Sequence, residues 1–295
     1  DDLMAEQGRR TLRDTMRNIT GISFQAGEGN PPGGSDSFSV RGFSARDDIF
    51  VDGIRDPGNY FRDPFYAERV EVTKGPASAF AGRGNVGGTV NIVTRQPGMV
   101  DLTRAELGIG TDAFYRGVVD VNRVFDSQSG GAFRVTAMAH DADEPGRDHV
   151  NNSRWAIAPS IAFGLEGDTQ FIVNYLHLEQ DDLPDYGLPN ARNFSLAGSG
   201  FEGRVAPVDR SNFYGYSTDY RRVETDVITG RVTHRFSETA TIENVTRFAR
   251  VNLDQMISAP RFLGAGERQV IAARSISSSR CAAVDRPLRT RRLHR

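Results

Sequence analysis

Lysine and cysteine are almost absent from this chain of 295 residues. Only Lys74 among the 36 basic residues is a lysine, so arginine carries nearly all of the positive charge. The single cysteine, Cys281, excludes an intramolecular disulfide and a cysteine metal cage. The five histidines are scattered and show no metal-ligand spacing, so we expect no metal site.

Long apolar segments are also missing. No stretch approaches the roughly 20 consecutive apolar residues of a membrane-spanning helix. The first residues, Asp1–Glu6, lack the regions of a signal peptide and an initiator Met, which is typical of a cut end. No nucleophile elbow or Ser/His/Asp grouping occurs, so we do not expect an enzyme. With 31 glycines and 18 phenylalanines, the composition favours turn-rich β structure over helices.

The charge is unevenly distributed although the formal net charge is only −2. Residues 268–295 hold eight arginines against one acid, Asp285, whereas the remaining chain is acidic. This tail shows no alternation and no aromatic residue. It is either a basic arm for nucleic acid or anionic lipid, or the product of a shifted reading frame. We favour the second interpretation and expect a frameshifted or disordered tail outside the domains, with no nucleic-acid partner.

Residues 1–98 are compact and rich in glycine. Leu12, Met16 and Ile19 form one apolar face and predict a helix near Leu3–Asn18. Short strands are expected at Ser37–Arg41, Ile49–Val51, Arg69–Val72 and Thr89–Val93. Gly82–Gly87 matches the letters of a dinucleotide fingerprint, but the residues that follow alternate as a strand, so we interpret the match as accidental.

Residues 99–267 change to alternating segments about ten residues long, the length of a tilted transmembrane β-strand. In the fourth segment Trp155, Ile157 and Ile161 alternate with small or polar residues. Long connections at Asp141–Ser153 and Gln180–Asp219 alternate with tight turns. A soluble sandwich or lipocalin-type barrel also alternates, but large apolar residues on one face and the loop asymmetry favour an outer-membrane barrel of which about seven strands are present.

Several motifs in the first part occur in a fixed order. They are Phe38-Ser39-Val40-Arg41-Gly42-Phe43, Val51-Asp52-Gly53-Ile54, Glu68–Pro76 (ERVEVTKGP) and Gly82–Thr94 (GRGNVGGTVNIVT). With this order the chain resembles the plug domain of TonB-dependent outer-membrane receptors, in the ferric-siderophore branch. Asp181–Pro189 resembles a loop that these receptors carry after the fifth strand. The resemblance covers residues 1 to about 257.

The resemblance implies an α+β plug domain (1–98) followed by an incomplete antiparallel transmembrane β-barrel (99–267), which in this family has about 22 strands. It implies a receptor in the outer membrane of a Gram-negative bacterium that imports a ferric siderophore with energy from the TonB protein. Iron would then be carried only as a chelate, with no resident cofactor, and lipid would surround the barrel. This chain would be a fragment that does not transport by itself. The alternatives are a passive outer-membrane channel or adhesin and, third, a soluble binding module.

Two sets of residues follow from the resemblance. The first would contact the chelate, because aromatic rings stack on it and arginine complements its charge; it comprises Arg55, Asn59, Tyr60, Phe61, Tyr186, Tyr214 and Tyr216. The second would hold the plug to the barrel wall through charged pairs; it comprises Arg41, Arg69, Glu71, Lys74 and Arg83.

Overall fold

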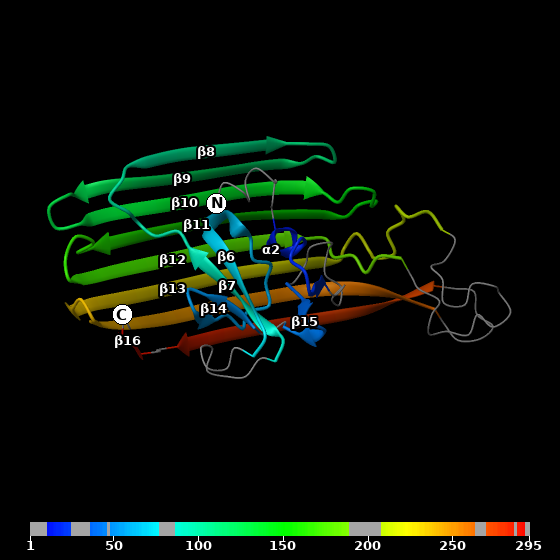
Figure 1. The fold of residues 1–295 in the computed structure, drawn as a ribbon. Helices are drawn as coiled ribbons and strands as arrows, with labels where there is room; N and C mark the ends of the chain where they lie inside the picture. The colour runs from blue at the N-terminus through cyan, green and yellow to red at the C-terminus, as the bar shows by residue number, and fades with distance from the viewer. Residues whose placement is uncertain are drawn as a thin grey trace.

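The computed structural model describes residues 11–24, 36–45, 48–76, 86–188, 208–262, 270–285 and 288–292, with side chains as far as residue 259. A small mixed domain, the plug, lies against one face of a long antiparallel sheet (Figure 1). An α+β plug followed by part of an antiparallel barrel was predicted, and this fold class is confirmed. In the described part of the chain no helix is long and apolar enough to cross a membrane.

The plug begins with a short helix, α2 (Leu12–Met16), in the second half of the predicted helix. Thr11 caps it, since its hydroxyl accepts a hydrogen bond from the Asp14 amide at 2.8 Å. Leu12 and Met16 are buried, as their spacing predicts. The first half of the predicted helix lies outside the described residues.

Two sheets build the rest of the plug. Their strands are β1 (Ile22–Phe24), β2 (Phe38–Val40), β3 (Phe43–Ser44), β4 (Ile49–Val51), β5 (Ile54–Arg55), β6 (Ala67–Lys74) and β7 (Gly88–Thr94). A 3₁₀ turn, η1 (Pro64–Tyr66), lies between β5 and β6. One sheet has the order β1-β2-β3 and the other β5-β4-β7-β6, with β4 and β7 parallel. The strand after the glycine-rich motif is thus confirmed. Gly88 has φ +144° and no room for a Cβ, which would lie 2.2 Å from the Thr73 carbonyl oxygen.

The large sheet is a meander in which each strand pairs with the next. Its strands are β8 (Leu102–Ile109), β9 (Tyr115–Asp126), β10 (Gly131–Asp143), β11 (Asn151–Phe163), β12 (Thr169–Asp182), β13 (Tyr220–Ser237), β14 (Ala240–Phe262), β15 (Val270–Asp285) and β16 (Leu288–Arg292). Strands β8 to β14 are the seven that alternation predicts. The sheet is open, with β8 at one edge and β15 at the other.

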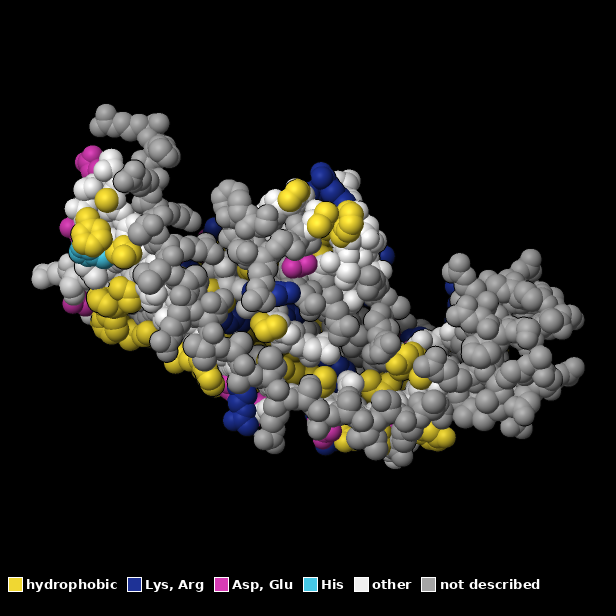
Figure 2. Space-filling view, turned by 90° about the horizontal axis from the view of Figure 1, so that it is seen from below, with side chains coloured by type: hydrophobic (Ala, Val, Ile, Leu, Met, Phe, Trp, Pro, Cys, Tyr) yellow, Lys and Arg dark blue, Asp and Glu magenta, His cyan; other side chains and the backbone are white. Residues whose placement is uncertain are grey.

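Alternation along these strands separates two faces. In β11, Arg154 and Ala156 are buried toward the plug, whereas Trp155, Ile161 and Phe163 are 45%, 37% and 48% exposed on the other side. In Figure 2 the plug stands on one side of the sheet and hydrophobic side chains follow the length of the sheet. An exposed band of large apolar side chains is typical of a lipid-facing surface.

The connections differ in length, but one is shorter than expected. The predicted long loop Asp141–Ser153 is wrong in its bounds, because β10 continues to Asp143 and pairs there with Asn151 of β11. Acidic strand ends resemble a loop in composition, which explains the error. The connection from β12 to β13 is long, as predicted, and the turn after β11 is tight around Gly164, whose φ is +74°.

The tail also departs from its prediction of disorder. Its backbone forms β15, which pairs antiparallel with β14 from Phe262↔Val270 to Arg247↔Asp285, and β16, which pairs with the start of the same strand. A free strand edge presents unpaired N–H and C=O groups that any extended segment can satisfy. The origin of the tail in a shifted reading frame stays a prediction.

Candidate functional site

Carboxylates of the plug and arginines of the sheet meet in a buried contact. Asp63 is the clearest case, because it binds two arginines from different strands. Arg116 of β9 donates to it at 2.7 and 2.8 Å, and Arg154 of β11 at 2.8 Å. The side chain of Asp63 is fully buried, and the two arginine side chains are 9% and 6% exposed. A buried carboxylate held by two guanidinium groups is a strong and directional link.

The local sequence fixes Asp63 in this position. Asp63 caps the 3₁₀ turn η1, accepting a hydrogen bond from the Phe65 amide at 3.0 Å, and Pro64 starts that turn. Burial alone would raise the pKa of Asp63, but Arg116 and Arg154 outweigh it and lower the pKa to about 2. Asp63 therefore stays ionised in this contact at any physiological pH.

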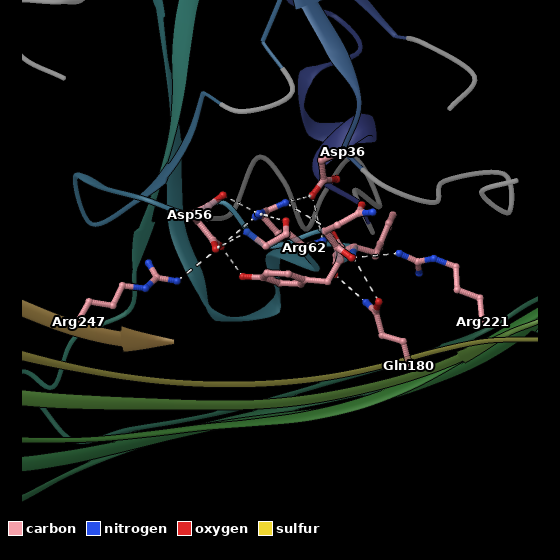
Figure 3. A network of polar contacts seen from close by, with 10 residues as sticks. Asp36, Asp56, Arg62, Gln180, Arg221 and Arg247 are labelled. Atoms are coloured by element: carbon pink, nitrogen blue, oxygen red, sulfur yellow. Dashed lines mark hydrogen bonds and ion pairs between the residues drawn. The ribbon is translucent and has the colours of Figure 1, made fainter. Parts of the chain in front are cut away.

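A second cluster centres on Arg62, which is 3% exposed (Figure 3). Its Nε lies 3.1 Å from Asp56 Oδ2, and its Nη1 lies 3.1 Å from Asp36 Oδ2. The Tyr60 hydroxyl donates to the same Asp56 oxygen at 2.5 Å. From the sheet, Arg247 of β14 approaches Asp56 at 3.5 Å. One guanidinium group thus joins two distant plug segments, and Asp56 connects them to the sheet.

The two carboxylates around Arg62 differ in pKa. Burial raises the pKa of Asp36 to about 6 in spite of Arg62, and Asp36 Oδ1 has no hydrogen-bond partner among the described residues. For Asp56, burial is opposed by both Arg62 and Arg247, and its pKa is lowered. The second arginine accounts for the difference, since each nearby cation favours the ionised carboxylate.

Further polar links extend the contact along the sheet. Arg95, just after β7, pairs at 3.0 Å with Asp120 of β9, which also binds Arg134 of β10 at 2.6 Å. Gln180 of β12 bonds both the amide and the carbonyl of Phe61, at 3.3 and 2.7 Å. Arg134 of β10 also donates to the Gln96 carbonyl at 3.1 Å, and Arg221 of β13 lies 3.4 Å from the Asn59 carbonyl. Plug and sheet are therefore connected through strands β9 to β14.

Apolar packing accompanies these links. A single buried cluster joins Leu12, Ile49, Tyr60 and Phe65 of the plug to plug-facing side chains of the sheet, and the latter are Met138, Ala156, Leu176, Leu178, Val223, Val227, Ala249, Val251 and Leu253. The plug and this part of the sheet share one hydrophobic core.

The residues predicted to contact a chelate differ in their surroundings. Arg55, at the end of β5, and Asn59, in the segment after it, are exposed. Tyr60 is 1% exposed, and its hydroxyl bonds Asp56, so in this structure it serves the contact between plug and sheet. Phe61 is 6% exposed and lines a cavity of about 610 Å³ between α2 and the ends of strands β10 to β12, together with Phe114 and His140.

The predicted tyrosines of the long connection are more accessible. Tyr186 and Tyr216 are 37% and 53% exposed, and Tyr214 is half-buried. The structure does not place them at the cavity beside Phe61. Their role in chelate binding stays a prediction.

The residues predicted to hold the plug to the wall lie on another side of the plug. Arg69 pairs with Glu71 at 2.8 Å along the exposed face of β6, and Lys74 donates to Thr20 at 3.1 Å. Arg41 is exposed, with φ +52°, and Arg83 lies outside the described residues. The charged pairs between the plug and the strands of this chain are formed by other residues, and the role of the predicted set in holding the plug to the wall stays a prediction.

Sequence reasoning missed Asp36, Asp56, Arg62, Asp63 and their arginine partners. A signal was available, since strand alternation places Arg116, Arg134 and Arg154 on the same face as mostly small or polar residues. Arginines on a plug-facing surface need buried acids, and the plug offers Asp56 and Asp63. No group of three or more His, Cys, Asp or Glu among the described residues could hold a metal ion.

The plug is held by buried ion pairs on a sheet whose other face carries an apolar band. These two features are typical of outer-membrane barrels that are closed by a plug. The sequence model of the TonB-dependent Receptor Plug Domain matches residues 1–89. The catecholate siderophore receptor Fiu of Escherichia coli K12 is 36% identical over 264 residues, which is 88% of this chain and 34% of Fiu. The probable TonB-dependent receptor BfrD of Bordetella pertussis is 36% identical over 279 residues, 94% of this chain and 37% of BfrD.

Solved structures agree with this assignment. The open form of Fiu from E. coli K12, described as a ferric-catecholate import receptor, superposes with a TM-score of 0.83 at 32% identity, covering 96% of this chain and 43% of Fiu. The chain belongs to the TonB-dependent siderophore receptors of the Gram-negative outer membrane. It spans about a third of the length of these relatives, which are receptors and not enzymes.

Proposed function

We propose that the protein to which this chain belongs binds a ferric siderophore at the outer surface and imports it into the periplasm with energy from TonB. The observation that carries this proposal is the 36% identity to a catecholate siderophore receptor across both the plug and the first barrel strands. The buried contact between plug and sheet supports it, because a receptor that imports a large chelate needs a closure that is held firmly in the resting state.

The chelate class that we propose is a ferric catecholate, which carries negative charge and aromatic rings. The matching cation and rings are offered by Arg55 and Asn59, exposed at and after the end of β5, by Phe61 at the cavity beside α2, and by Tyr186, Tyr214 and Tyr216 on the long connection. Iron enters as part of this chelate. The outer apolar band would face lipid. We propose no nucleic-acid partner, no resident cofactor and no enzymatic activity.

Uptake of radioactive iron tests the function. The complete receptor, expressed in a strain that lacks its own siderophore receptors, is supplied with ferric catecholate, ferric hydroxamate or ferric citrate. We expect uptake from the catecholate that stops when a protonophore or loss of TonB removes the energy source. Uptake that continues without energy would identify a passive channel instead, and absence of uptake from every chelate would reject the proposal.

A further inference from the structure

One arginine holds both ends of the long connection between β12 and β13. Arg147 lies in the turn from β10 to β11, and its Nε and Nη2 donate to the two carboxylate oxygens of Asp185 at 2.7 and 3.0 Å. Its Nη1 donates to the carbonyl oxygen of Arg210. Asp185 lies near the start of the connection and Arg210 near its end. These three residues are called the clasp below.

The clasp is a protected contact. The side chains of Arg147 and Asp185 are 12% and 4% exposed, and further chain around them would only bury them more. Arg222 and Asp181, at the same end of the sheet, form an ordinary surface pair at 3.2 Å, in which the side chains are 63% and 57% exposed. A bidentate pair that is shielded from water is stronger and more directional than an exposed single contact.

The local sequence shapes the clasp at the start of the connection. Asp185 Oδ1 also accepts a hydrogen bond from the Gly187 amide at 2.8 Å, and Gly187 adopts the left-handed conformation with φ +72°. These residues belong to Asp181–Pro189, the segment that resembles a loop of siderophore receptors. The contact with Arg147 thus assigns a structural role to the aspartate in the middle of this segment.

The turn from β10 to β11 is itself closed and binds the connection through a second residue. The Glu144 amide donates to the Val150 carbonyl oxygen at 2.8 Å and closes this turn. Next to Arg147, the Asp148 amide donates to the Ser211 carbonyl oxygen at 2.7 Å, and the Ser211 hydroxyl donates to Asp148 Oδ2 at 3.0 Å. Two neighbouring residues of the turn therefore hold the end of the connection.

The clasp lies among the residues predicted to contact a chelate. The predicted tyrosines of the connection directly follow Asp185 or come shortly after Arg210, and they are Tyr186, Tyr214 and Tyr216. The same turn lines the cavity of about 610 Å³ beside Phe61, through Glu144 and Pro145. The turn thus touches both the cavity and the connection that carries the tyrosines.

We propose that Arg147 is a positioning residue for chelate capture, which fixes the base of the long connection before the chelate arrives. The inference rests on the proposed function and adds to it a residue that acts through the connection. A loop whose ends are already held together has paid the entropy of closure. It therefore binds with a smaller loss of conformational freedom than a loop that must be ordered by its ligand.

The substitution Asp185→Asn distinguishes positioning from direct contact with the chelate. Asparagine retains a side-chain oxygen for the Gly187 amide but lacks the charge that pairs with Arg147. If Arg147 bound the negatively charged chelate itself, removal of the neighbouring carboxylate would strengthen binding. In a positioning role the clasp is weakened instead, and we expect the Kd to rise about tenfold in Asp185→Asn and in Arg147→Ala.

Fluorescence quenching of the purified complete receptor by the ferric complex of dihydroxybenzoate, a simple catecholate, measures the Kd. Arg222→Ala removes the exposed pair at the same end of the sheet and is the matched control, with a Kd expected within about twofold of the parent. The double variant Arg147→Ala/Asp185→Asn is expected to bind no more weakly than either single variant, because all three lose the same contact. An unchanged or lower Kd for Asp185→Asn, or an equal rise for Arg222→Ala, would overturn the proposal.

Uptake of radioactive iron from the same chelate separates capture from the later steps. We expect Arg147→Ala to raise the KM about tenfold and to leave the maximal rate within about twofold of the parent, at equal amounts of receptor in the outer membrane. A lower maximal rate with an unchanged KM would place Arg147 in folding or translocation and would contradict a positioning role.

The last measurement needs no chelate. A nitroxide spin label is attached at Val208→Cys, a site near Arg210 that is 38% exposed, in a receptor without other reactive cysteines. We expect the label to be more mobile in Arg147→Ala and Asp185→Asn than in the parent, and unchanged in Arg222→Ala. Equal mobility in all four receptors would refute the clasp. Absence of binding and uptake of every chelate would reject the proposed function, whereas the spin label would still decide whether Arg147 holds the connection.

Discussion

Single carboxylates decide how the plug is held. Asp63 combines two tasks, since it caps η1 and neutralises Arg116 and Arg154. Its partners lie 53 and 91 residues away in sequence. We therefore expect that removing the charge of Asp63 strongly lowers the free energy of unfolding.

The substitution Asp63→Asn tests this expectation. Asparagine retains the cap but leaves two buried arginines without their anion, so we expect a loss of about 3–5 kcal/mol in the free energy of unfolding. Urea denaturation of the detergent-solubilised receptor measures it. Asp168→Asn is the matched control, because its pair with Arg235 is 3.0 Å long but the side chains are 68% and 58% exposed; a loss below about 1 kcal/mol is expected there. Equal losses would contradict the special role of Asp63.

Asp36 gives the plug a pH dependence of unusual sign. Its folded pKa of about 6 lies above the ordinary value of 3.8, so between these values the folded state holds a proton that the unfolded chain has released. The contribution of Asp36 to stability is therefore present at low pH and is lost as the pH rises through about 6. The loss in the free energy of unfolding is on the order of 2–3 kcal/mol. Asp63, with its pKa near 2, loses its own contribution only in much stronger acid.

Unfolding of the receptor in urea at a series of pH values checks this. The stability of the parent is expected to fall from pH 4 to pH 7 relative to Asp36→Asn, in which the side chain cannot titrate. The variant retains an oxygen that can accept from Arg62. Parallel pH profiles for the parent and the variant would show that Asp36 is ionised across the whole range.

At the scale of elements, tight turns set the register of the sheet. Gly164 follows β11 with φ +74°, and a Cβ there would lie 2.1 Å from the Thr169 carbonyl oxygen. Gly164→Ala is expected to cost at least about 1 kcal/mol and to lower the urea midpoint of the receptor. Gly167→Ala in the same turn is the control, since its Cβ would meet nothing closer than 3.6 Å. An equal effect of both substitutions would contradict this explanation.

The elements were largely predictable because their patterns are local. Alternation located seven strands of the sheet, and Ile49–Val51 was predicted with the bounds that β4 has. Strand ends beyond the apolar band, such as Asp141–Asp143, were misread because acidic composition is shared by loops and solvated strands. The pairing of Asp56 with Arg247 or of Asp63 with Arg154 could not be predicted, since it depends on how the plug is placed against the sheet. Sequence periodicity shows which face an arginine occupies, but not the acid that it meets.

At the scale of the whole molecule, the open sheet has a direct consequence. Strands β8 and β15 end the sheet without closing it, and unpaired backbone groups at such edges are not tolerated in lipid. We expect that this chain expressed alone gives no siderophore-dependent growth to an iron-uptake mutant, whereas the complete receptor does. Growth supported by the chain alone would contradict this expectation. Immunoblots of outer-membrane fractions control for expression.

The link between Asp36 and Arg62 has a mechanical consequence. It fastens the two ends of the stretch from Asp36 to Arg62 to each other, since both the guanidinium group and the backbone amide of Arg62 donate to Asp36 Oδ2, and β2, β3, β4 and β5 lie in the loop that this link closes. Tension applied to the chain ahead of Asp36 reaches this bond before it reaches β4. Separating Asp36 from Arg62 would therefore open this loop at its base and leave the bonds of Asp56 and Asp63 to the sheet intact.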